Sequence, residues 1–191
     1  MNVILASQSP RRRELLAQMH IPFTVQVADI DETMDAQKPV AEEVARVSLL
    51  KAQRVNRGEK DVVIAADTVV VCDGKALGKP ATEQEAAQML TMLSGRAHQV
   101  MTGLSVVRGD RVVSVTEITE VYFRPLTQKE IWAYIATKEP MDKAGSYGIQ
   151  GGAALFVERI NGDYFNVVGL PVCRLGQILT ELAPEVMEER Q

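Results

Sequence analysis

Residues 62–71 read VVIAADTVVV, an almost unbroken run of β-branched and small apolar side chains. This length and composition predict a strand that is buried on both faces in the middle of a sheet. Asp67 and Thr68 interrupt the run at its centre. Because an unpaired buried carboxylate is costly, Asp67 needs a cation, a metal ion or a catalytic role. The alternative, an aspartate at a strand end satisfied by backbone N–H groups, suits Asp73 in the Asp73-Gly74 turn better.

The segments on either side of this strand mix helical and extended patterns irregularly. Capping boxes at residues 82–85 and 127–130 predict two helix starts, and Pro10 after Ser9 predicts another. We expect helices at residues 10–19, 39–55, 82–94, 127–137 and 171–182, and extended segments at residues 3–6, 23–27, 61–72, 75–77, 100–107, 111–116, 118–123, 154–160 and 164–168. Residues 184–191 are polar and are expected to form a frayed tail. This irregular order predicts an α/β fold with a mixed sheet, not a strict βαβ repeat.

The composition is that of an ordinary soluble globular protein. The 191 residues are 46% hydrophobic and 24% charged, which suffices for one domain with a substantial core and leaves room for two lobes. A formal net charge of -4 without a basic stripe argues against a nucleic-acid-binding surface. No apolar run approaches the roughly 20 residues that a membrane span needs. We therefore expect neither nucleic acid nor a membrane as a partner.

The cysteines and the N-terminal residues bear on where the protein works. Cys72 and Cys173 give neither a disulfide framework nor the spacing of zinc ligands. Both lie among apolar residues, so we expect reduced thiols packed in the core. Residues 1–10 are too short for the apolar region of a signal peptide and fit a first strand better. These features predict a cytoplasmic protein.

The segment LASQSPRRRELL at residues 5–16 places three arginines, Arg11–Arg13, in the first turn of a predicted helix. Cations there oppose the helix dipole, each at a cost of about 0.3–1 kcal/mol. Ser7 and Ser9 add small polar groups beside the same helix N-terminus. This combination is typical of anion sites, phosphate above all. The alternative is a solvated helix end that binds nothing.

Three further polar residues have an ordinary explanation beside a functional one. Lys51 lies at helical spacing from Val44 and Val47, so its ammonium group would reach solvent past an apolar face. Lys79 follows the predicted hairpin and would either reach the same cleft as the buried aspartate or lie on the surface. Glu32, in an acidic loop, would be either a metal ligand or a solvated carboxylate.

Several common catalytic motifs are missing from the sequence. There is no GxxxxGK[ST] phosphate loop and no GxSxG elbow, and the only histidines, His20 and His98, have no motif spacing. Without a Cys/His cluster, a bound metal would be hard and oxygen-liganded, Mg²⁺ or Mn²⁺. Basic groups at a helix N-terminus, a buried aspartate and carboxylates suited to such a metal together suggest hydrolysis of a phosphoanhydride.

The ordered motifs SQSPRR, AADT, GKP, SGR, KEPMDKAGSYGIQG, INGDY and VGLP resemble those of the Maf family of nucleotide pyrophosphatases, from Leu5 to about Leu182. The resemblance implies a fold related to the inosine triphosphate pyrophosphatases, in which an elongated mixed sheet with flanking helices forms two lobes around a cleft. It implies one Maf-like domain over residues 1–191, often as a homodimer. It also implies cleavage of a nucleoside triphosphate to the monophosphate and pyrophosphate with a divalent cation, Mg²⁺ or Mn²⁺.

The resemblance also implies roles for individual residues. Asp67 falls on the aspartate proposed as the family's proton acceptor, and Glu32 together with Asp67 would hold the metal. The polar positions that would bind the substrate phosphates are Ser7, Arg12, Lys51 and Lys79.

Base recognition is implied at three positions, Arg11, Thr68 and Gln150. This set resembles the branch of the family that hydrolyses dTTP and UTP and some modified pyrimidine nucleotides. A sister branch that acts on 7-methyl-GTP has an aromatic residue, a glutamine and a glutamate there instead. Two alternatives stay open: this 7-methyl-GTP activity, and a non-catalytic protein that binds nucleotides or a partner and regulates septum formation.

Overall fold

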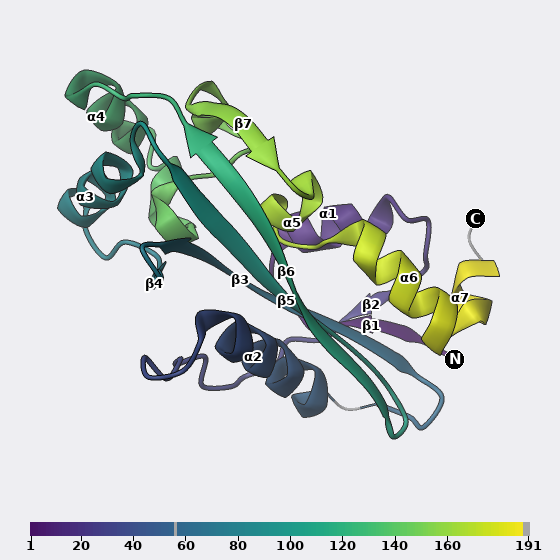
Figure 1. Ribbon diagram of the computed structural model, residues 1–191. Helices are drawn as coiled ribbons and strands as arrows, with labels where there is room; N and C mark the ends of the chain where they lie inside the picture. The colour runs from purple at the N-terminus through teal and green to yellow at the C-terminus, as the bar shows by residue number, and fades with distance from the viewer. Residues whose placement is uncertain (56, 189–191) are drawn as a thin grey trace. The chain divides into compact units, whose positions relative to one another are not determined.

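The computed structural model describes residues 1–55 and 57–188 and contains one seven-stranded sheet flanked by helices (Figure 1). The strands are β1 (Val3–Leu5), β2 (Thr24–Val25), β3 (Val62–Cys72), β4 (Lys75–Leu77), β5 (Ala97–Arg108), β6 (Arg111–Phe123) and β7 (Val157–Asn161). The helices are α1 (Pro10–Ala17), α2 (Val40–Arg54), α3 (Glu83–Leu93), α4 (Gln128–Ala136), α5 (Tyr164–Val168), α6 (Val172–Leu182) and α7 (Pro184–Glu188), with short 3-10 turns η1 (Glu139–Asp142), η2 (Ala144–Ser146) and η3 (Gly152–Leu155).

The order of the strands in the sheet is β2-β1-β3-β5-β6-β7, and β4 pairs with β3 outside this path. β1 runs parallel to both β2 and β3, whereas β4 is antiparallel to β3 and β7 is antiparallel to β6. Both directions in one sheet confirm the predicted mixed α/β class. β3 is buried along its whole length except at Thr68, which is half-buried, so the central strand is confirmed as well.

The chain divides into two compact units, and the division falls inside β3. The first unit consists of Met1–Asp67, Thr102–Glu117 and Gly169–Gln191, and the second of Thr68–Met101 and Ile118–Val168. Asp67 and Thr68, the polar pair at the centre of the strand, are therefore neighbours in the chain that belong to different units.

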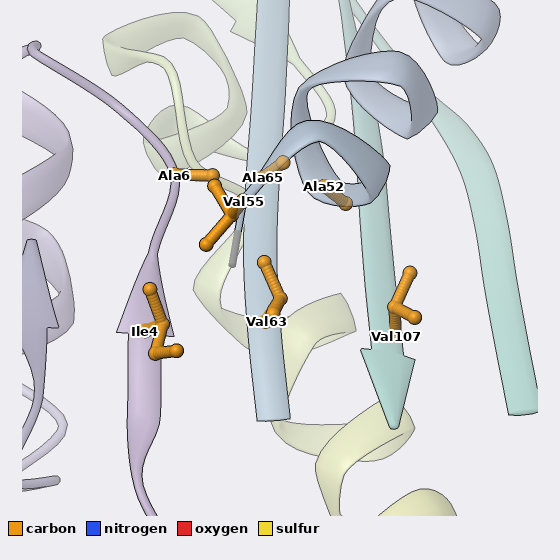
Figure 2. Packing of buried hydrophobic residues seen from close by; sticks show 7 residues of the cluster. All are labelled: Ile4, Ala6, Ala52, Val55, Val63, Ala65 and Val107. Atoms are coloured by element: carbon orange, nitrogen blue, oxygen red, sulfur yellow. The ribbon is translucent and has the colours of Figure 1, made fainter. Parts of the chain in front are cut away.

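The core of the first unit packs α2 against the sheet. Figure 2 shows the buried side chains of this cluster, which come from β1 and the residue after it, from β3 and β5, and from the end of α2 and the residue after it. They are Ile4, Ala6, Ala52, Val55, Val63, Ala65 and Val107. Gly103 in β5 makes the close approach of the helix possible, since a Cβ atom there would lie 2.2 Å from the carbonyl oxygen of Val44. A side chain at this position would push α2, and with it Lys51, away from the strands.

The core of the second unit contains a group of edge-to-face rings. His98, Phe123 and Tyr147 contact one another with ring centroids 4.8–5.4 Å apart, and Phe156 and Tyr134 extend the group. The Nε2 atom of His98 and the hydroxyl of Tyr147 share a 2.8 Å hydrogen bond. This contact anchors the glycine-rich segment that follows η1 in the core.

Four segments differ from the sequence-based expectation. In the segment expected to be extended at residues 154–160, residues 154–155 belong to the 3-10 turn η3, and the strand begins only at Val157. The two strands expected at residues 111–116 and 118–123 are one strand, β6. Residues 164–168 form helix α5 instead of an extended segment, because the Asp163 carboxylate accepts a hydrogen bond from the Phe165 N–H and favours a helical turn. Residues 184–188 are not a frayed tail but helix α7, with Val186 buried and Glu185 paired with Arg108; residues 189–191 lie outside the described residues.

The two cysteines differ in burial. Cys72 is buried as expected, but Cys173 is exposed, so the prediction that it packs in the core was wrong. Cys173 lies in the first turn of α6, on the side opposite the buried Leu175. In the part of the chain that the structure describes, no helix combines the length and the apolar character that crossing a bilayer requires.

Candidate active site

The start of α1 has the geometry that the sequence predicted. Ser9 is the N-cap, and its hydroxyl accepts a hydrogen bond from the backbone N–H of Arg12 at 3.4 Å. The buried Ser7 hydroxyl accepts from the Ser9 N–H at 3.2 Å and from Arg12 Nη1 at 3.3 Å. Serine oxygens therefore hold the turn that precedes the helix, and one of them orients a guanidinium group.

Arg12 is held from a second direction by a distant part of the first unit. Its Nε donates a 2.8 Å hydrogen bond to the carbonyl oxygen of Gly169. Burial lowers the pKa of Arg12, and the negative charges of Asp67 and Glu32 act in the opposite direction. An arginine keeps its proton in proteins, so a fixed positive charge stands within electrostatic range of both carboxylates. Sequence reasoning missed Gly169 as a partner, although it lies in the motif VGLP.

Lys51 joins the two acidic residues of the first unit. Its ammonium Nζ lies 2.7 Å from Asp67 Oδ1 and 3.0 Å from Glu32 Oε1. The Lys51 and Asp67 side chains are only 9% and 12% exposed, whereas the Glu32 side chain is 57% exposed. The cation that a buried Asp67 required is thus Lys51. The alternative that the ammonium group of Lys51 escapes to solvent is wrong.

The first unit therefore brings together six of the predicted site residues. These are Ser7, Arg11, Arg12, Glu32, Lys51 and Asp67, linked by the contacts given above or by the charge of Arg11 acting on Arg12. The cluster combines two carboxylates with two arginines and a lysine. Such a cluster can orient a polyanion on its cations while keeping a carboxylate close to it.

The remaining three predicted residues belong to the second unit. Thr68 is half-buried in β3, while Lys79 after β4 and Gln150 in the glycine-rich segment are both exposed. Gly145, at the start of that segment, has a φ of 66°, and its N–H donates to the carbonyl of Gly78 at 3.0 Å. The backbone next to Lys79 is thereby tied to the segment that leads to Gln150.

The described residues offer carboxylate oxygens to a divalent cation but not a complete set of protein ligands. In residues 1–55 and 57–188 there is no group of three or more His, Cys, Asp or Glu side chains that could hold a metal. Glu32 and Asp67 nevertheless turn one oxygen each toward the same ammonium group. Mg²⁺ is commonly bound by one or two carboxylates together with substrate phosphates. The two residues therefore fit a hard cation that is held jointly with a phosphorylated substrate.

Comparison with known proteins identifies one matching family and relatives that share one name. Residues 2–182 match the model of a protein family described as Maf-like protein. A protein of Symbiobacterium thermophilum named dTTP/UTP pyrophosphatase is 54% identical over 181 residues, which cover 94% of this chain and 93% of that protein. A Bacillus cereus protein of the same name is 47% identical over 185 residues, 96% of this chain and 97% of that protein.

Among solved structures, a HAM1 protein from Coxiella burnetii is similar over 95% of this chain and 99% of that one. The TM-score is 0.49 at 17% sequence identity.

Proposed function

The chain belongs to the Maf family, and we propose that it hydrolyses dTTP and UTP to the nucleoside monophosphates and pyrophosphate. The observation that supports this hydrolysis is the position of the Lys51 ammonium group between Asp67 and Glu32, two carboxylates within electrostatic range of Arg12 at the start of α1. A triphosphate needs cations to bind it, and the water that attacks phosphorus needs a base. The first unit supplies both kinds of group.

In this proposal Asp67 accepts the proton of the attacking water. Its position in an otherwise apolar strand keeps competing water away, and Lys51 fixes the direction of its carboxylate. The substrate phosphates are bound by Ser7, Arg12, Lys51 and Lys79. Lysine and arginine side chains stabilise the charge that develops on the pyrophosphate leaving group.

Glu32 and Asp67 are the residues that would hold a Mg²⁺ or Mn²⁺ ion. When bound, such an ion neutralises phosphate charge and polarises the phosphoryl oxygens. Lys51 contacts the same two carboxylates and is bound to them in the structure described here. Once the carboxylates bind the metal ion in its place, the Lys51 ammonium group would be available to bind the substrate phosphates.

Arg11, Thr68 and Gln150 are proposed to select the base. A glutamine amide both donates and accepts a hydrogen bond, which matches the N3–H and O4 edge of uracil and thymine. An ionised glutamate at the same position would only accept. We further propose that residues 1–191 act as one Maf-like domain, as a homodimer, in the cytoplasm, where removal of these nucleotides would clean the nucleotide pool.

A panel of nucleoside triphosphates with product identification by phosphorus NMR tests this function. Pyrophosphate and a nucleoside monophosphate are expected, with dTTP and UTP preferred over dCTP, dATP and GTP. Orthophosphate with a diphosphate product would contradict the proposed bond cleavage, and a preference for 7-methyl-GTP would contradict the proposed substrate. Nucleotide binding without turnover would favour the regulatory alternative. The Asp67→Asn protein, purified in parallel, controls for contaminating phosphatases.

A further inference from the structure

Two hydrogen bonds hold the backbone around Gln150, one of them two residues before it and the other two residues after it. The N–H of Gly148 donates to the Tyr134 hydroxyl at 3.1 Å, and the N–H of Gly152 donates to Glu139 Oε2 at 3.0 Å. The Tyr134 hydroxyl in turn donates to Glu139 Oε1 at 2.8 Å. The two anchoring side chains are thus joined to each other, and Gln150 lies between the two anchored glycines.

The anchors reach the loop only because glycine occupies the positions that face them. A Cβ atom at Gly151 would lie 2.0 Å from Glu139 Oε1, and one at Gly152 would lie 3.2 Å from the Tyr134 ring. The loop backbone therefore packs directly on the two side chains. A glycine-rich loop is otherwise the most mobile kind of backbone, so these contacts are what restricts it.

One of the two anchors, Tyr134, is itself fixed by the core of the second unit. Tyr134 on α4 is 5% exposed and packs edge-to-face on Phe156, with ring centroids 5.2 Å apart. Burial raises the pKa of Tyr134, so its hydroxyl keeps the proton that it donates to Glu139. Gln150, by contrast, is exposed. The loop thus has rigid supports inside and presents one long polar side chain outside.

We infer that Tyr134 and Glu139 are positioning residues for base selection, which they control by fixing the loop that presents Gln150. The inference rests on the proposed role of Gln150. A glutamine amide carries its donor and its acceptor side by side, so the place from which it approaches a base decides which hydrogen-bonding edge it matches. Held at one position, it offers the pattern that pairs with uracil and thymine. On a released loop it also finds geometries that pair with the N3 acceptor and N4 donor of cytosine.

The test compares kcat/KM for dTTP with kcat/KM for dCTP in Tyr134→Phe and Glu139→Ala. We expect the dTTP/dCTP ratio to fall about tenfold or more in both variants, because small displacements of a contact group have effects of this size. The ratio separates a positioning effect from a general structural defect, since such a defect lowers kcat/KM for both substrates alike. Glu139→Gln, which keeps one acceptor oxygen, should lie between wild type and Glu139→Ala, and it serves where Glu139→Ala does not fold.

A matched control is Tyr122→Phe, which also removes a tyrosine hydroxyl bonded to a glutamate, here Glu120 at 3.1 Å. Its ratio should equal that of the wild type. Gln150→Ala separates the two proposals. A changed ratio in Gln150→Ala with unchanged ratios in folded Tyr134→Phe and Glu139→Gln would overturn the positioning inference alone. An unchanged ratio in Gln150→Ala would overturn the role of Gln150 and the positioning inference together.

Discussion

The ammonium group of Lys51 lies 2.7 Å from Asp67 Oδ1, and it is the contact that makes a charged residue tolerable in the middle of β3. The pair is unequal in its surroundings, because Lys51 also contacts the exposed Glu32. Asp67 therefore depends on Lys51, while Lys51 keeps a second carboxylate if Asp67 is lost. This asymmetry gives the substitutions below different expected effects.

Asp67→Asn should lower kcat by roughly 10²–10⁴-fold, the usual effect of losing a general base. The amide is nearly the same size and can still accept a hydrogen bond from Lys51, so the fold should persist. Steady-state kinetics with dTTP at several metal concentrations measure the effect and separate it from weakened metal binding. A folded variant with near wild-type kcat at saturating metal would exclude the assigned role.

Lys51→Met should destabilise the protein by about 3–5 kcal/mol, because it removes the ammonium group that contacts the buried Asp67 carboxylate. Urea unfolding measures this loss. The double variant Lys51→Met/Asp67→Asn should recover part of it, since neither charge of this pair remains. Arg96→Met is the matched control: it breaks an ion pair with Asp73 in which both side chains are exposed, and should cost no more than about 1 kcal/mol. Equal losses in the two single variants would contradict this account.

Removal of divalent metal by EDTA should stop turnover, and added Mg²⁺ or Mn²⁺ should restore it. Glu32→Gln should raise the metal concentration needed for half-maximal activity, because an amide oxygen carries no negative charge for the ion. Binding of Mn²⁺ followed by electron paramagnetic resonance gives the same comparison without turnover. Identical Mn²⁺ affinities in wild type and Glu32→Gln would remove Glu32 from the metal site.

Gln150→Glu should lose activity toward dTTP and UTP. The ionised carboxylate cannot donate to O4, and an unpaired acceptor at a contact that the bound base buries costs about 1–3 kcal/mol, more for a charged group. Values of kcat/KM for dTTP, UTP and 7-methyl-GTP should be measured for wild type and variant. Unchanged kcat/KM for dTTP would show that Gln150 does not read the base.

Stability should fall on mild acidification because of His98. Burial lowers the pKa of His98 to about 4, from an ordinary value of 6.5. As the pH falls, the unfolded chain takes up this proton before the folded one. The stability that the neutral, buried His98 contributes is complete above about pH 6.5 and is lost as the pH falls toward about 4. Between pH 8 and pH 5 the loss should be about 2 kcal/mol.

Urea unfolding at these two pH values measures the effect of His98. The double variant His98→Phe/Tyr147→Phe removes the imidazole together with the hydroxyl bonded to it, and should lose less stability over the same interval. His20 is exposed, with a φ of 57°. His20→Asn tolerates that backbone conformation and should keep the wild-type pH dependence. Equal pH dependence in the double variant and the wild type would show that His98 does not contribute.

Local patterns were sufficient for most of the fold. The composition of residues 62–71 predicts a central strand because burial of apolar side chains dominates its environment, and β3 confirms it. The Ser9 and Thr127 caps fix helix starts because their hydrogen bonds join residues three apart. The same local reasoning was wrong at residues 164–168, where the Asp163 cap and the burial of Asn166 among polar partners on β5 and β6 produce a helix.

The residue types around Asp67 are enough to predict that it needs a charged or chemical partner, because the cost of a bare carboxylate follows from burial alone. The identity of the partners came from the folded chain: Lys51 contacts Asp67 from 16 residues away on α2, and the carbonyl of Gly169 holds Arg12 across 157 residues. The same holds for the Tyr134 and Glu139 contacts around Gln150. Such contacts depend on where packing brings separate elements, and a linear pattern states which groups need partners but not which groups come within 3 Å.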